Sequence, residues 1–243
     1  MDDPENIPSS DSDSDFSESD HEQREKLRQR NTFCGIEIKK QFGFMQFLSV
    51  FFLAGSMMMI GVYMNAQLAY MLPDKEYFAI SRTEIGMQTS NLTIYSLPFS
   101  LITTFFISYA FELLGRKFTI SVSYLLTGII FFVIPYTKPY FWFLAVMRCA
   151  IGVTMAGPLS HPLINDYVRK NSRGKAIALN GLGAVFGEVM AMGVLLRLSK
   201  SMTYEAAFAL TGSIIIGWGV YFSLFIKNPN LRNIQKKIDK SSQ

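Results

Sequence analysis

The sequence predicts an all-α membrane protein, a single bundle of six transmembrane helices with an acidic N-terminal tail. The 243-residue chain is 49% hydrophobic and has a mean hydropathy of +0.22, more apolar than an ordinary soluble domain. A helix needs about 20 mostly uncharged residues to cross about 30 Å of hydrocarbon. Continuous apolar runs indicate helices, because only helices and closed barrels satisfy their backbone polar groups in lipid. Six runs qualify or nearly do, the third being short: 44–72, 84–113, 118–136, 140–167, 175–198 and 204–227.

The ends of the chain differ in composition from the six runs. Residues 2–25 hold ten acids and several serines but no apolar stretch, so this segment is not a secretory signal peptide. Such a segment cannot bury enough apolar surface to offset its ordering entropy, and we expect a disordered acidic, Ser-rich tail over residues 1–31. We expect a basic juxtamembrane segment over 32–43, the six-helix bundle over 44–227 and a basic tail over 228–243.

Lysine and arginine are distributed unequally between the two sides of the predicted membrane. One side collects seventeen of the 23, namely six within residues 24–40, Arg116 and Lys117, four within 169–175 and five within 227–240. The other side has five, and Arg148 lies inside the fourth run. The positive-inside rule therefore predicts a multi-pass protein of the lipid bilayer with both termini in the cytoplasm. The formal net charge of +4 reflects this topology and indicates no nucleic-acid partner.

The first run, 44–72, contains no charged residue. Tyr63, Asn65 and Gln67 are among its polar residues, and we take them as candidates for contact with a polar solute or coupling ion. The second run begins at a capping-box pattern over residues 81–84, where a serine is followed three residues later by a glutamate.

A short charged turn separates the second run from the third. An acid ends one helix, a glycine allows a tight reversal, and two cations open the next helix on the same side of the bilayer. The residues that define the pattern are Ser108, Glu112, Gly115, Arg116 and Lys117.

The fourth and fifth runs each carry one charge at membrane depth. An arginine there costs a few kcal/mol, so we expect Arg148 to face a partner or a water-filled cavity. Glu188 is the only acid well inside any run, and both residues lie equally far from Val168 in the intervening loop. If consecutive helices are antiparallel neighbours, the two charges have matching depth. Equal depth leaves open whether they form an ion pair or face different ways.

Small residues in these runs permit close helix packing. Gly152 lies one turn after Arg148, and Gly183 and Gly187 have the four-residue spacing that brings two membrane helices together. The sixth run is uncharged and is predicted to be a packing helix. Cys34 precedes the first run and Cys149 lies inside the fourth, so we predict no disulfide, no metal site and no cofactor.

Three of these patterns resemble the major facilitator superfamily. The loop between its second and third helices reads Gly-x-Leu-Ala-Asp-Arg-x-Gly-Arg-Lys, and Gly115, Arg116 and Lys117 match, with Glu112 in place of the aspartate and Ser108 in place of the first glycine. Its fourth helix often reads Leu-x-x-x-Arg-x-x-Gln-Gly, which is similar to residues 144–152 with isoleucine for the glutamine. An Arg-Gly pair commonly opens its fifth helix, as at 173–174 here.

The resemblance covers residues 44–232 and implies one six-helix bundle made of two three-helix repeats. It implies that the turn around Gly115 is a conformational-switch loop and that the chain transports a small-molecule solute. The superfamily holds its solute between two such bundles at mid-membrane, and this sequence supplies the N-terminal one. A second bundle would come from a homodimer, a partner protein or a C-terminal half.

Other six-helix families fit less well. The sequence has no threefold Pro-x-Asp/Glu-x-x-Lys/Arg repeat of mitochondrial carriers and no Asn-Pro-Ala pair of aquaporin-like channels. It also lacks the Gly-x-Ser-x-Gly motif and the paired aspartates of intramembrane proteases, so we expect no enzyme. Two functions remain: a half-length secondary transporter that needs a second bundle, or a non-transporting structural or accessory subunit of a larger membrane complex.

Overall fold

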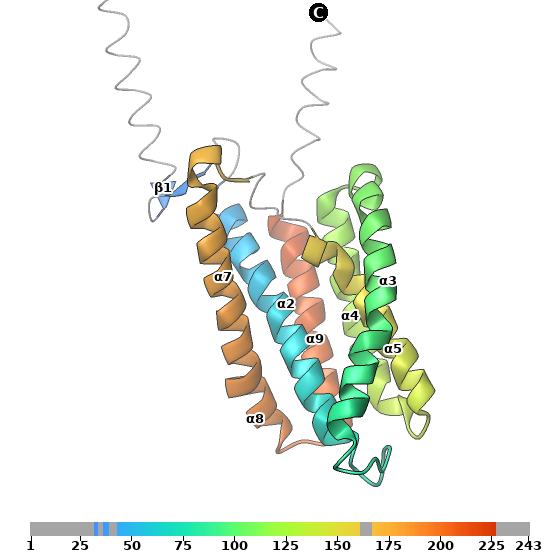
Figure 1. The fold of residues 1–243 in the computed structure, drawn as a ribbon. Coiled ribbons are helices and arrows are strands. Elements are labelled where there is room, and N and C mark those ends of the chain that lie inside the picture. The colour runs from blue at the N-terminus through green and yellow to red at the C-terminus, as the bar shows by residue number, and fades with distance from the viewer. Residues whose placement is uncertain (1–31, 34–35, 39–42, 161–166, 227–243) are drawn as a thin grey trace, which may run out of the picture.

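Six long helices make up the body of the protein in a computed structural model that describes residues 32–33, 36–38, 43–160 and 167–226 (Figure 1). All six are long and apolar enough to cross a membrane. The predicted fold class is therefore confirmed. The predicted tails over 1–31 and 228–243 lie outside the described residues. The helices are α2 (Phe44–Met71), α3 (Ile85–Leu113), α4 (Arg116–Val133), α5 (Phe141–Ser160), α7 (Arg173–Met190) and α9 (Tyr204–Phe225).

Short helical segments complete the third and fifth spans. The 3-10 helix η1 (Ile134–Thr137) extends α4 to a length that spans a membrane, and the change of helix type coincides with Pro135, which has no backbone N–H to donate. A π-helical turn η3 (Ala191–Leu195) and the short helix α8 (Leu196–Ser199) continue α7. The 3-10 helix η2 (Lys170–Ser172) precedes it.

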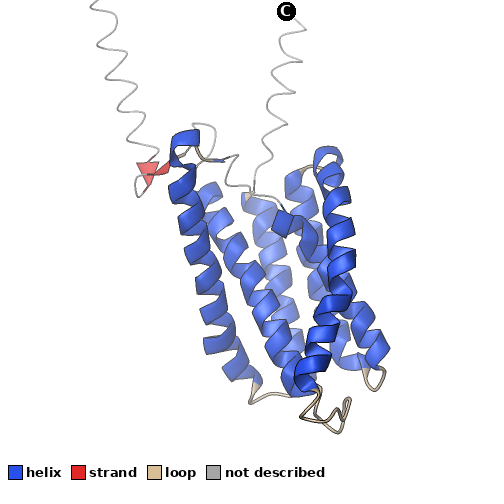
Figure 2. Cartoon of the chain, viewed as in Figure 1, coloured by secondary structure: helices blue, strands red, loops and turns tan. Residues whose placement is uncertain are grey.

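The only strands in the described part of the chain are two residues long and lie outside the bundle (Figure 2). Strand β1 (Thr32–Phe33) pairs antiparallel with β2 (Ile36–Glu37), and Ile38 forms a single bridge with Val168, between α5 and η2. Ile36 and Ile38 are both buried. The segment expected to be only basic and juxtamembrane is thus also fastened to the bundle through apolar side chains.

The packing of the helices follows two interleaved repeats of three. Repeat one is α2, α3 and α4, and repeat two is α5, α7 and α9. The first helix of each repeat packs on the second helix of the other, α2 on α7 and α5 on α3, and the two third helices, α4 and α9, pack together. Two similar three-helix units related by a pseudo-twofold axis would pack in this way.

The expectation that the fourth and fifth helices are neighbours is wrong. Helix α5 packs mainly on α3 and α4, whereas α7 packs on α2, and these partners place α5 and α7 on opposite sides of α2 (Figure 1). Consecutive elements are adjacent in most folds but not in all. Here the interleaving of the repeats separates them.

The six helices alternate in direction, so α2 begins and α9 ends at the same end of the bundle (Figure 1). We name this end the tail face. The opposite end, the loop face, carries the loop between α2 and α3 and the residues between α8 and α9.

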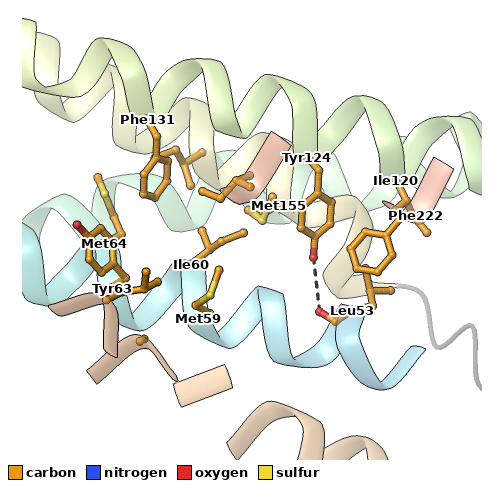
Figure 3. Close-up of a cluster of buried hydrophobic side chains, with 14 of the residues drawn as sticks. Leu53, Met59, Ile60, Tyr63, Met64, Ile120, Tyr124, Phe131, Met155 and Phe222 are labelled. Carbon is orange, nitrogen blue, oxygen red and sulfur yellow. Dashed lines mark hydrogen bonds between the residues drawn. The ribbon is translucent and has the colours of Figure 1, made fainter. Parts of the chain in front are cut away.

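The centre of the bundle is filled by aromatic side chains from α2, α4 and α9 (Figure 3). The largest fully buried ones are Tyr63, Tyr124, Phe131, Phe208 and Phe222. The hydroxyl of Tyr124 lies 2.6 Å from Ser56 Oγ and 3.5 Å from the carbonyl oxygen of Leu53. Because a buried hydroxyl needs a partner, these contacts fix α4 against α2.

Helices α3 and α7 are the least buried of the six, and large apolar side chains cover their outer surfaces. On α3 the most exposed are Leu101, Phe105, Phe106, Tyr109 and Leu113, and on α7 Ile177, Leu182, Val185 and Val189. Such surfaces require lipid or another protein rather than water.

Candidate functional site

The first helices of the two repeats meet through one polar contact. Arg148 on α5 donates a hydrogen bond from Nη2 to Oδ1 of Asn65 on α2, at 3.1 Å. Arg148 lies roughly 10 Å along α5 from its start, and Asn65 lies about as far from the end of α2, at 1.5 Å per residue. The contact therefore sits in the half of the bundle nearer the loop face, between two segments distant in sequence.

The guanidinium of Arg148 has more donors than the bundle uses. Its Nε is buried without a hydrogen-bond partner, and among the described residues no carboxylate lies within ion-pair distance. Asn65 is exposed and Arg148 is half-buried, so the pair is not sealed inside the bundle. A guanidinium carries five donors and a fixed positive charge. The arrangement is able to hold a further acceptor or anion.

Glu188 lies elsewhere. It is exposed on α7, and the structure forms no ion pair between it and Arg148. The hypothesis of an Arg148–Glu188 pair is wrong for this conformation, because α2 separates the helices that carry the two charges. Equal distance from the connecting loop did not predict a common face.

The three polar candidates on α2 point to different surroundings. Tyr63 is fully buried, and its hydroxyl lies 2.7 Å from Ser199 Oγ and 3.2 Å from the carbonyl oxygen of Ala207. Gln67 lines a cavity at the loop face, and only Asn65 is with Arg148. Asn65 lies about 200° around the helix axis from both Tyr63 and Gln67, whereas those two are one turn apart on the same side of α2, and Ser199, the neighbour of Tyr63, also lines the cavity of Gln67.

Gly115 gives the predicted turn its shape. It is the N-cap of α4 with φ 84° and ψ 149°, a backbone conformation that residues other than glycine rarely adopt. Arg116 and Lys117 follow in the first turn of α4 at the tail face. The backbone at Ser108 and Glu112 is helical within α3, and their side chains lie outside the described part of the structure.

The three packing glycines lie at helix crossings. A Cβ on Gly152 of α5 would stand 3.3 Å from the Cβ and carbonyl oxygen of Ser96 on α3. A Cβ on Gly183 of α7 would stand 2.6 Å from the carbonyl oxygen of Phe51 on α2, and one on Gly187 would overlap the backbone of Gly55. The α2–α7 crossing is therefore a contact of backbone on backbone.

A cavity of about 410 Å³ opens at the loop face between the end of α2, the loop that follows it, and the start of α9. Beside it Tyr77 donates a hydrogen bond to Glu205, whose carboxylate lies 3.5 Å from Nζ of Lys138. Burial and this hydrogen bond raise the pKa of Tyr77, so its hydroxyl stays a donor at any physiological pH. This cluster was not predicted from the sequence, although tyrosines and acids occur together within residues 70–77 and 204–205.

Comparison with known proteins gives one match. The model of the Major Facilitator Superfamily matches residues 42–241, which include all six helices. Searches of curated proteins and of solved structures gave no match.

Proposed function

The chain belongs to the major facilitator superfamily, whose members are membrane transporters, and from this premise we propose that it is a half-length secondary transporter. Its six helices form one bundle, and a second bundle completes the route for a small solute. The second bundle is another copy, a partner chain or a further part of the same protein.

The contact between Arg148 and Asn65 is the observation that carries the proposal. A charge at this depth is costly in hydrocarbon, so its surroundings are expected to be protein or water rather than lipid. Its unused donors favour a polar or anionic solute as the additional partner. An anion bound there changes the balance between inward-facing and outward-facing states only if it binds one of them better.

The same reasoning supports a second bundle. Asn65 and Glu188 are exposed on the surface of the bundle at membrane depth, on α2 and α7. A lone bundle would present both to acyl chains. A second bundle that covers these surfaces would replace lipid by protein and water, and close packing between the bundles would contribute to their association.

We therefore expect that the 27.5 kDa chain, purified in mild detergent, is not a monomer. Native mass measurement should give a homodimer or a complex with another membrane protein. The same sample in liposomes should accumulate at least one solute from a panel of radiolabelled organic anions and neutral metabolites. A monomer that accumulates solute would contradict the need for a second bundle, whereas a stable complex that moves none would favour the accessory-subunit function.

The orientation is a separate proposal, with the tail face in the cytoplasm. In a Cys149→Ser background Cys34 is the single thiol, since the chain has two cysteines. A membrane-impermeant maleimide is expected to label Cys34 in inside-out vesicles and not in right-side-out vesicles. Detergent-permeabilised vesicles give the full extent of labelling. Labelling only in right-side-out vesicles would reverse the topology.

A further inference from the structure

The cavity at the loop face has the size of a small-molecule site. Its volume of about 410 Å³ lies within the range of ligand pockets, roughly 300–1,000 Å³. Helix α2, the loop after it, α8 and the start of α9 surround it. The residues that carry its chemistry are Gln67, Tyr70, Asp74, Glu76, Lys200 and Tyr204.

Gln67 is a buried polar group without a partner. Its side chain is 3% exposed and lines the cavity, and the described residues offer it no hydrogen bond. Gln46, the other buried glutamine of α2, accepts one from the backbone N–H of Gly43 at 2.7 Å. The amide of Gln67 is not fully enclosed, so it is reached from the cavity and offers both a donor and an acceptor to a polar occupant there.

The charge of the cavity is negative. Three carboxylates line it, those of Asp74, Glu76 and Glu205, against the single ammonium of Lys200. Glu205 is engaged by Tyr77 and Lys138. Among the described residues no cation lies within ion-pair distance of Asp74 or Glu76. The two acids therefore lack a counter-ion.

Aromatic rings at the cavity already attract cations. Lys138 Nζ lies 4.4 Å from the centroid of the Tyr77 ring, and Lys200 Nζ lies 5.9 Å from that of Tyr70. Rings at these distances stabilise an ammonium group through their negative faces. Tyr204 packs edge-on against Tyr77 and donates to the carbonyl oxygen of Tyr70, which holds the rings in place. The described residues contain no group of three ligands suited to a metal ion.

We propose that this cavity binds a small organic cation, with Asp74 and Glu76 as counter-charge, the Tyr70 ring against its ammonium group and Gln67 as hydrogen-bond partner. The site is distinct from the Arg148–Asn65 contact, because Gln67 and Asn65 project from different sides of α2. It lies within one bundle and does not depend on a second one, so its test is independent of the proposed transport.

The test uses choline and its neutral isostere 3,3-dimethylbutan-1-ol, which differ in charge but hardly in shape. Titration calorimetry on the purified full chain in nanodiscs should show saturable binding of choline and none of the alcohol. Gln67→Met and Asp74→Asn should each weaken choline binding by roughly tenfold, since each removes a polar partner of the ligand. Lys200→Met should strengthen it, because a competing ammonium is lost.

Glu84→Gln is the matched control, since Glu84 is exposed at the start of α3 on the same face but does not line the cavity. It should leave the affinity unchanged, and thermal unfolding of each variant verifies its fold. Equal binding of the alcohol, no binding of choline, or equal losses for Asp74→Asn and Glu84→Gln would each overturn the proposal. Weaker binding in Lys200→Met would overturn it too, because an anion site has the opposite dependence on that charge.

Discussion

Replacing Gly187 by leucine is expected to abolish the folded bundle. A Cβ at this position would overlap the carbonyl group of Gly55, and that obstacle is backbone, which cannot rotate away as a side chain can. Gly183 and Gly55 are tight to a lesser degree, with Cβ positions 2.6 Å from the Phe51 carbonyl oxygen and 2.9 Å from the Gly183 carbonyl oxygen. Helices α2 and α7 would have to separate along their whole crossing, which places the loss at about 3 kcal/mol or more.

Gly181 provides the control on the same helix. A Cβ there would meet nothing within 4 Å, so Gly181→Leu adds a residue of higher helix propensity on an exposed face. The measurement is the fraction of monodisperse protein in detergent and its thermal unfolding midpoint. We expect Gly187→Leu to aggregate or to melt far below the wild type, and Gly181→Leu to resemble it. Equal midpoints for the two variants would mean that α2 and α7 are not packed as the structure has them.

This crossing illustrates how far the sequence predicts the fold. The Gly183–Gly187 spacing predicted a close approach of two helices, because small residues let backbones meet, but it could not name the partner helix. Hydropathy likewise predicted six helices, since hydrocarbon thickness sets their length. It does not tell which apolar faces meet, and so the interleaving of α2 with α7 and of α5 with α3 appears only in the structure.

The candidate site was predictable in its residues and not in its contacts. Arg148 was a candidate because a charge in an apolar run requires a partner or water. The partner considered from the sequence was an opposite charge, Glu188. In the structure Arg148 donates to the neutral Asn65 instead, whereas Tyr63 is a core residue whose hydroxyl lies within hydrogen-bond distance of Ser199 Oγ. Gln67 was a candidate from the sequence, but the other cavity residues were missed because they come from the end of α2, the loop after it and the connection from α8 to α9, each polar for ordinary reasons.

Removing Arg148 is expected to abolish transport without weakening the fold. Arg148→Met deletes a charge that the bundle satisfies with one hydrogen bond, and it leaves behind only Asn65, which is exposed. Asn65→Leu keeps the charge and removes its partner, so the guanidinium loses the hydrogen bond to Asn65. A hydrogen bond to a charged group contributes about 1.5–3 kcal/mol, so this variant should lose that much stability. The double variant should recover most of the loss, and the recovery measures the coupling of the two residues.

Solute uptake into liposomes separates a role in transport from a role in structure. We expect uptake to fall to background in Arg148→Met although its unfolding midpoint is unchanged. Arg148→Lys keeps the charge and loses the planar fork, so partial uptake would indicate that charge alone suffices, and none that the fork positions the solute. If the contact only joins α5 to α2, Arg148→Met should instead be less stable than the wild type. Its uptake should then fall only in proportion to the fraction of unfolded protein. Normal uptake in Arg148→Met would exclude this residue from the transport route, and with it the observation on which the proposed function rests.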